Sequence, residues 1–306
     1  MRWEELEDAL EVLETDREYD GYFCSIKAAV IIVILGSLCD LQSVKKIHAW
    51  ATTEHVRKFL EETFGIKRIP CYWWLLSLLG IIRPESLNEC MKQWVASVVP
   101  ELAAKLEAEE NEQSKQKKKT LTIAIDGKEI RSTGKMKKYD NPLHIISAQI
   151  GELGLTLAQR TVESKSNEIP AVPELIKELA IPGCMVVADA MNCQIETAEA
   201  IIEAEADYLL SAKGNQEALM NDIAEYVQDT KLRAKMDSIT RTEKGHGRKE
   251  RRSAYTSDDV GWQPGGRIWP ALKCIGALHT RFETSKGVTE EWHYYISSKA
   301  LRAEEL

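Results

Sequence analysis

The first hundred residues place apolar side chains with the period of an α-helix. Ser25 stands before the apolar run 26–38, and Ser43 before a segment with apolar residues on one face, which is where helix-capping residues occur. Further helices are predicted over 55–64, 72–79 and 85–99. We therefore expect an all-α N-terminal domain over residues 1–106, with its tryptophans and tyrosines in the core.

Residues 107–119 read EAEENEQSKQKKK and contain almost no apolar side chain. This composition is typical of a charged linker between domains. Its basic end, Lys115–Lys119, is either a solvated tether or a contact to phosphate, and the sequence leaves both interpretations open.

The pattern changes after Thr120, where short runs rich in β-branched residues alternate with amphipathic segments. Strands are predicted over 121–125, 143–150, 155–162, 185–188, 208–212, 249–255, 271–282 and 292–297. Helices are predicted over 172–179, 196–205 and 216–227. Strands followed by alternating helix and strand predict an α/β domain with a mixed central sheet over residues 120–306.

Two aspartates stand at the ends of apolar strands. Asp126 follows TLTIAI and precedes Gly127, and Asp189 follows MVVA. In open α/β sheets, ligands bind at the carboxyl ends of strands, and carboxylate oxygens suit Mg²⁺. Asp126 and Asp189 are therefore candidate metal ligands; the alternative is that each aspartate only caps a turn between strand and helix.

Composition excludes only a few classes of function. The net charge of −8 argues against a molecule whose whole surface is basic, although a local basic patch still allows DNA binding. The seven cysteines form no CxxC pair, which indicates reduced thiols of a cytoplasmic protein rather than a zinc ribbon or a disulfide framework. The apolar run 28–39 is too short to span a bilayer, and nothing in the sequence points to export or a membrane partner.

The segment GHGRKERR is dense in cations, and glycines at its start allow close approach of a phosphate backbone. The alternative interpretation is a solvated edge strand with protective charges. Other polar side chains near the two aspartates or at a junction of strand and helix are candidate phosphate contacts. The predicted DNA-binding residues are Lys128, Arg131, Gln194, Lys213, Asn215, His246, Arg248, Lys249 and Arg251. His144 and His293 lie in apolar strands and are expected to be packed core residues.

Seven segments, in this order, resemble the H-repeat-associated (ISAs-type) branch of bacterial insertion-sequence transposases of the DDE class. They read IAIDGKEIR, HIISAQ, ESKSNEIPAVPELI, DAMNCQ, DYLLSAKGNQ, EKGHGRKERR and YYISS. The resemblance extends, more weakly, to the helical N-terminal region. It implies a ribonuclease-H-like fold with a β-rich insertion and a site of three carboxylates.

In this family Asp126 matches the first acid and Asp189 the second, and together they hold two Mg²⁺ ions, with Mn²⁺ as a substitute. The family's third acid is a glutamate on a helix after the YYISS strand. Only KALRAEEL follows Ser298, and neither Glu304 nor Glu305 matches the pattern. The resemblance therefore implies a chain that is C-terminally truncated and inactive by itself.

The leading function is transposition of an insertion sequence, by phosphodiester hydrolysis and strand transfer at transposon ends. The implied partners are double-stranded DNA, at the transposon ends and the target, and further copies of the chain. Two alternatives remain: a non-catalytic remnant that binds DNA or a partner transposase, and a metal-dependent nuclease with Glu250 as the third acid. Arg248, Arg251 or Arg252 is expected to pair with Glu250.

Overall fold

The computed structural model describes residues 3–19, 23–94, 97, 120–131, 133, 142–151, 155–162, 168–179, 181–245, 248–262, 264–284 and 287–306. The chain divides into two compact units, residues 1–109 and 110–306. The expected linker, 107–119, lies outside the described residues. No helix in the described ranges is long and apolar enough to cross a membrane.

The N-terminal unit is helical where it is described, as the apolar periodicity predicts. Its helices are α1 (Trp3–Ala9), η1 (Leu10–Val12), α2 (Ile26–Leu38), α3 (Val44–Ala51), α4 (Glu54–Phe64) and α5 (Tyr72–Leu79), followed by helical residues at 84–94 and 97. The predicted caps are confirmed, because the Ser25 hydroxyl accepts a hydrogen bond from the Ala28 N–H and the Ser43 hydroxyl accepts one from the Lys46 N–H. Gly65 ends α4 at a φ of 65°, which glycine adopts without strain.

The core of this unit is built from aliphatic side chains of α2, α4 and α5. The expectation that every tryptophan here is buried is wrong for α5, where Trp73 is 74% and Trp74 44% exposed. Successive residues of a helix point about 100° apart. Leu75 and Leu78 occupy the buried face of α5, so Trp73 and Trp74 point away from it.

The C-terminal unit contains one nine-stranded sheet in the order β3-β2-β1-β4-β5-β9-β8-β7-β6. Its strands are β1 (Thr122–Ile130), β2 (Leu143–Ile150), β3 (Leu155–Val162), β4 (Met185–Ala188), β5 (Asp207–Ala212), β6 (Asp237–Gly245), β7 (Arg248–Ser257), β8 (Cys274–Thr284) and β9 (Gly287–Ser297). The helical segments are α7 (Glu168–Lys177), η4 (Ala190–Asn192), α8 (Ile195–Glu203), η5 (Gly214–Gln216), α9 (Glu217–Gln228), α10 (Thr230–Arg233), η6 (Pro264–Gly266) and η7 (Ala303–Glu305). The predicted mixed α/β architecture is confirmed.

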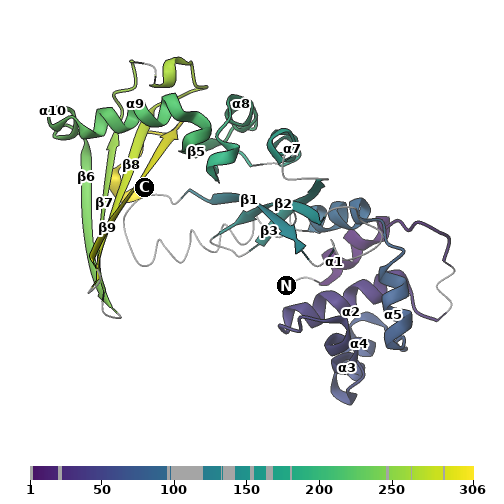
Figure 1. Ribbon diagram of the computed structural model, residues 1–306. Helices are drawn as coiled ribbons and strands as arrows, with labels where there is room; N and C mark the ends of the chain where they lie inside the picture. Colours follow the sequence, from purple (N-terminus) through teal and green to yellow (C-terminus); the bar gives the residue numbers. More distant parts are fainter. Residues whose placement is uncertain are drawn as a thin grey trace, which may run out of the picture. The chain divides into compact units, whose positions relative to one another are not determined.

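Parallel pairing is confined to β1, β4 and β5, and all other neighbours are antiparallel. Figure 1 shows α7, α8 and α9 on one side of the sheet. On β1, Ile123 and Ile125 are buried whereas Ala124 between them is exposed, so the two faces of this strand meet different surroundings.

The two halves of the sheet are joined where β5 pairs with β9. This pairing covers only Leu209–Ala212 against Tyr294–Ser297, although β9 has 11 residues. The remainder of β9 continues with β8 alone, as part of the antiparallel ribbon β9-β8-β7-β6.

Strand β6, which forms an edge of the sheet, was not predicted. Ile239 is its only large apolar residue, so the alternation that identifies a half-buried strand is nearly absent from its sequence. Because β6 covers β7, the interpretation of the segment around Arg248–Arg252 as an edge strand is wrong.

Candidate active site

Asp126 and Asp189 are neighbours across the parallel pair β1 and β4. Ile125 is paired with Ala188, so the chain places an aspartate directly after each of these two residues. Adjacent strands lie about 4.8 Å apart, and side chains at matching positions of a parallel pair point to the same face. Asp126 and Asp189 therefore each follow the last aligned pair of β1 and β4, and Asp126 lies on the face of β1 that also bears Ala124.

The alternative that each aspartate only caps a turn fails for Asp126, which lies inside β1 with four strand residues after it, Gly127 to Ile130. Its side chain is exposed and has no hydrogen-bond partner among the described residues. Asp189 does cap a turn, since its Oδ1 accepts from the backbone N–H of Asn192 at 3.3 Å. Its Oδ2 makes no contact of this kind within the described ranges. Three carboxylate oxygens are thus open for a ligand.

Asp189 is anchored by a buried chain of polar side chains that the sequence interpretation missed. The Asn192 amide donates to Asp189 Oδ1 at 3.0 Å and to Glu168 Oε1 at 2.9 Å. Glu168 Oε2 lies 2.7 Å from His144 Nε2. Glu168 is 2%, His144 4% and Asn192 0% exposed. The prediction that His144 is a core residue is confirmed, and its partner is an acid on α7.

The same network lies directly beneath the residue after Asp126. A β-carbon placed on Gly127 would overlap the Glu168 carboxyl group. Glycine is therefore needed here for close approach rather than for backbone conformation. Glu168 thus contacts Gly127, next to one aspartate, and through Asn192 the other aspartate itself.

Two predicted phosphate contacts lie on the aspartate face. Lys128 follows Asp126 by two residues on β1, and Lys213 follows Ser211 at the end of β5. Both side chains are exposed, and neither forms an ion pair within the described part of the chain. Arg131 is 91% exposed beyond the end of β1, with its Nε 3.8 Å from Glu129 Oε1.

Two other predicted phosphate contacts connect the loops that follow β4 and β5. Asn215 donates its side-chain amide to the Ala190 carbonyl. Gln194 donates to the Met191 carbonyl at 3.1 Å and accepts from Gln216 at 3.2 Å. These amides hold the loop that carries Asp189 against the loop before α9, and this is the role that the structure gives them.

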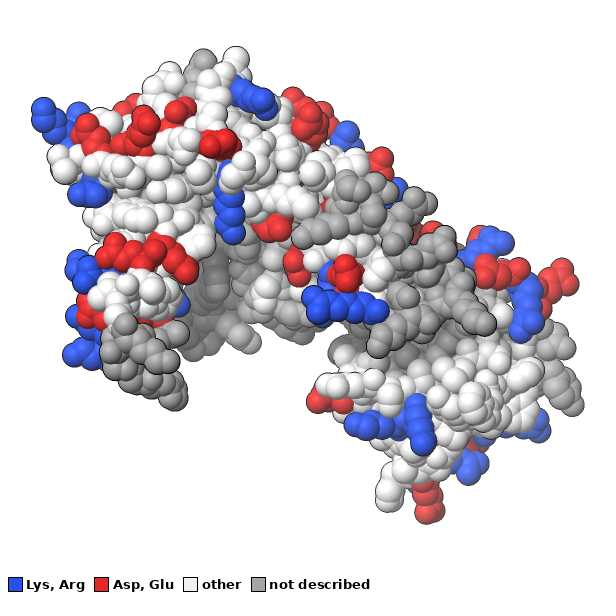
Figure 2. Space-filling view, in the orientation of Figure 1, with Lys and Arg blue, Asp and Glu red and all other residues white. Residues whose placement is uncertain are grey.

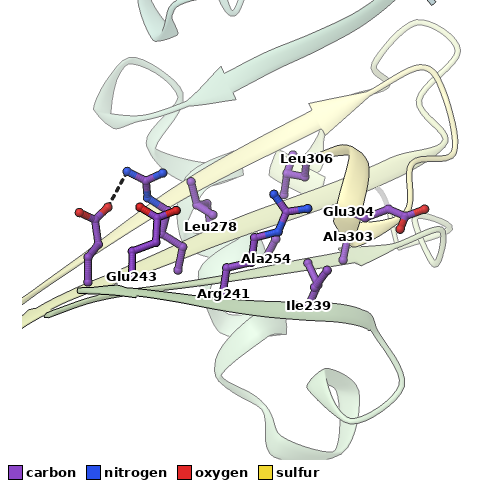
Figure 3. A pocket seen from close by; sticks show the side chains of 10 residues that line it. Ile239, Arg241, Glu243, Ala254, Leu278, Ala303, Glu304 and Leu306 are labelled. Atoms are coloured by element: carbon purple, nitrogen blue, oxygen red, sulfur yellow. Dashed lines mark ion pairs between the residues drawn. The ribbon is translucent and has the colours of Figure 1, made fainter. Parts of the chain in front are cut away.

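Glu250 does not lie with the two aspartates. It is on β7, four strands from β4, which is about 19 Å across the strands at about 4.8 Å per strand, and its register with Thr289 of β9 displaces it further along the sheet. Its side chain is 6% exposed and pairs with Arg252 at 2.5 Å, as expected for a residue in a basic strand. Glu250 lines a pocket together with Arg241 and Glu243 from β6. Figure 3 shows this pocket, and its dashed line marks the ion pair between lining residues.

The basic strand β7 carries exposed charge at Arg251 and Arg252. Lys249 Nζ lies 3.5 Å from Oε2 of Glu283 on β8. Arg248 belongs to β7 with a side chain outside the described set, and the predicted contact His246 also lies outside the described residues. In the view of Figure 2, basic and acidic side chains are interspersed, and the described residues form no continuous basic band on that face.

The cysteine that follows Asp189 in the chain is a buried thiol. All seven cysteines are free, and Cys193, in the loop after Asp189, is completely buried. Burial raises the pKa of the Cys193 thiol to about 12, which keeps it protonated at neutral pH. Among the described residues, no three or more Asp, Glu, His or Cys side chains are placed to hold one ion.

Comparison with known proteins adds a family to this geometry. The family model described as "Transposase DDE domain" matches residues 117–306. A protein of Xanthobacter autotrophicus, described as "Uncharacterized protein in dhlA 3'region", is 30% identical over 277 residues, which is 89% of this chain and 86% of that protein. Its length and coverage make it a relative over both units.

Relatives from Escherichia coli carry transposase names. The "Putative transposase YncI" of strain O157:H7 is 36% identical over 60% of this chain and 48% of its own length. The "H repeat-associated putative transposase YhhI" of strain K12 is 31% identical over 77% of this chain and 60% of its own length. The chain therefore spans about half to three fifths of these two relatives.

Among solved structures, a piggyBac transposase synaptic complex with hairpin DNA superposes on 98% of this chain and 57% of that chain. The sequence identity is 10% and the TM-score 0.37, which is too low to indicate a shared fold.

Proposed function

Because this chain belongs to the transposase DDE domain family, we propose that it acts on the DNA ends of an insertion sequence, with Asp126 and Asp189 as ligands of divalent metal ions. The observation that supports the proposal is the parallel register of β1 and β4, in which Asp126 and Asp189 each directly follow a residue of the last aligned pair. Within the family, we group the chain with the H repeat-associated relatives, of which YhhI is one.

The ribonuclease-H-like fold is part of this proposal. The described sheet supports it through the order β3-β2-β1-β4-β5, in which β1 is antiparallel to β2 and parallel to β4. The antiparallel ribbon β6 to β9 follows β5 in sequence and is the β-rich insertion of that proposal.

The donor set fits Mg²⁺, with Mn²⁺ as a substitute. Mg²⁺ prefers carboxylate oxygens and keeps several positions for water and substrate phosphate. A pair of such ions would supply charge stabilisation at the phosphorus and activation of the attacking oxygen. The chain's own contribution is positional: Asp126 offers both carboxylate oxygens, and Asp189 offers Oδ2 while Oδ1 is held by Asn192.

Lys128 and Lys213 would orient the DNA backbone over this site, because their charges lie on the aspartate face without an internal partner among the described residues. Phosphate contacts of this kind fix the register of a protein on DNA. We further propose that the chain acts in an assembly of several copies that brings two DNA ends together.

The test uses the purified 306-residue chain and, beside it, a version extended with the family's C-terminal helix, with Mg²⁺ or Mn²⁺ and duplex DNA carrying the element ends that flank its gene. We expect Asp126→Asn and Asp189→Asn each to lower the rate of strand cleavage by at least about 10²-fold, since small misplacements of reacting groups have effects of this size. DNA affinity should change little. Asp258→Asn, which removes an equal charge from an exposed loop, is the matched control.

Cleavage at the wild-type rate in either aspartate variant would contradict the metal-ligand assignment. A second candidate function is DNA binding without cleavage. It is favoured by the finding that, within the described ranges, no three Asp, Glu, His or Cys side chains are placed to hold one ion. Binding of end DNA with no cleavage by the wild-type chain, in either metal, would support this second function.

The basic strand β7 is expected to contribute to DNA affinity through phosphate. Replacing Arg248, Lys249 and Arg251 together by Ala should weaken binding at every sequence. It should also reduce the slope of log K against log salt by about one unit for each lost contact. The control is Arg160→Ala, because Arg160 lies on β3, outside the basic strand, and forms ion pairs with both Glu174 and Glu178. An unchanged slope in the triple variant would remove β7 from the DNA interface.

A further inference from the structure

We propose that the buried chain His144–Glu168–Asn192 is a positioning network that fixes the carboxylate of Asp189 for metal binding. This inference rests on the proposed function. It assigns a role to three residues that touch neither DNA nor metal themselves. Its members come from three separate segments, β2, α7 and η4, so the network also fixes the loop of Asp189 relative to the sheet.

The orientation of the Asn192 amide follows from its partners. Nδ2 carries two hydrogens, and the two acceptors Glu168 Oε1 and Asp189 Oδ1 lie at 2.9 and 3.0 Å. Turning the amide over would place its oxygen against two carboxyl oxygens, which is repulsive. With Nδ2 in place, the amide carbonyl oxygen is buried without a partner among the described residues. Both N–H groups of the Asn192 side-chain amide therefore donate to acids, one to Glu168 and one to Asp189.

Asp189 is held asymmetrically as a result. Oδ1 accepts twice from Asn192, from the side-chain amide and from the backbone N–H. This arrangement fixes the rotation of the carboxylate and directs Oδ2 away from the network. Metal affinity depends on such fixed ligand orientation, and loss of the partner that holds a ligand typically lowers affinity 10–100-fold.

Stability alone does not account for a buried acid at this position. A pair of buried apolar side chains of similar volume is commonly as stable as a buried His–Glu pair, or more stable. The pair here is completely enclosed and connects, through a single amide, to a carboxylate that is open to solvent on its other side. Through these hydrogen bonds the buried core fixes the position of Asp189 Oδ1.

The experiment measures Mn²⁺ binding to the full chain from the decrease of the free-ion electron paramagnetic resonance signal, without DNA. We expect Asn192→Ala to weaken Mn²⁺ binding by about 10–100-fold. Asn192→Leu, which keeps the buried volume without the donors, should have the same effect if the Ala variant does not fold. Glu168→Gln should bind within about 3-fold of wild type, because a side-chain carbonyl still accepts from Asn192.

Two controls separate positioning from general destabilisation and from failure of the site itself. Ile201→Val removes a buried methyl group from α8 and should leave Mn²⁺ affinity unchanged. The double variant Asp126→Asn/Asp189→Asn defines binding without the site. Wild-type binding no stronger than that of the double variant would overturn the proposed function, and this inference with it.

Wild-type Mn²⁺ affinity in folded Asn192→Ala or Asn192→Leu would overturn the positioning role alone. Weakened binding in Glu168→Gln equal to that of Asn192→Ala would overturn it as well, since the charge of Glu168 rather than its hydrogen bond would then control the site.

Discussion

Replacing Gly127 by Ala is expected to lower the free energy of unfolding of the C-terminal unit by about 3 kcal/mol. The added β-carbon would overlap the Glu168 carboxyl group. That group has little freedom to move, because His144 and Asn192 hold its two oxygens. The backbone of β1 has little freedom either, since β2 and β4 flank it on both sides. Urea unfolding followed by circular dichroism measures the loss.

Gly151→Ala is the matched control for this change. Gly151 follows β2, and a β-carbon there meets nothing within 4 Å. We expect its effect to stay within about 0.5 kcal/mol. A double variant tests the cause directly, because Glu168→Ala removes the overlapping atoms. The loss of unfolding free energy in the double variant should be smaller than the sum of the losses in Gly127→Ala and Glu168→Ala. Strict additivity would show that the loss at Gly127 has another origin.

The second large effect is expected from His144→Ala, which should lower the free energy of unfolding by about 3–5 kcal/mol. The substitution removes His144 Nε2, which lies 2.7 Å from Glu168 Oε2. The Glu168 carboxyl group, in a residue that is 2% exposed, then loses this hydrogen-bond partner. It also creates a cavity beside β2. The measurement is again urea unfolding of the full chain.

His293→Ala provides the comparison for a histidine in a strand with an acid nearby. The His293 side chain is 35% exposed, and its Nε2 lies 3.8 Å from the exposed Glu291. Exposed pairs of this kind contribute at most about 1 kcal/mol, so the expected loss is correspondingly small. Equal losses from the two histidine variants would mean that the buried partner of His144 contributes nothing measurable.

Much of the fold follows from local pattern. The strands 143–150, 155–162 and 185–188 and the helix 72–79 have the predicted bounds. Each is a short apolar or alternating run that is followed by Gly or a charged residue, which makes its limits readable without tertiary information. His293 shows the limit of this approach: its neighbours in β9 are apolar, yet its side chain lies half-exposed rather than in the core.

The candidate site was only partly readable in the same way. Asp126 and Asp189 each end an apolar run, and that signal is local. Glu168 gives no such signal, because its burial depends on a histidine 24 residues earlier and an asparagine 24 residues later. Gly127 marks close approach of another group only because β1 continues to Ile130, beyond the strand predicted over 121–125.

The short join between β5 and β9 has a consequence for how the sheet responds to thermal fluctuation. The strand pairing between the parallel half and the ribbon of β9, β8, β7 and β6 consists of four residue pairs, and the further hydrogen bonds from Tyr208 and Ser298 lie at the same end of β9. Cooperative opening follows the density of such connections, so segments with few of them exchange backbone hydrogens independently of the rest. The far ends of the ribbon, near Gly245 and Gly287, can therefore open and close without disturbing β1 and β4. One hydrogen-bonded sheet thus contains two parts that open independently: the strands β1 and β4 beside the aspartates, and the far ends of the ribbon.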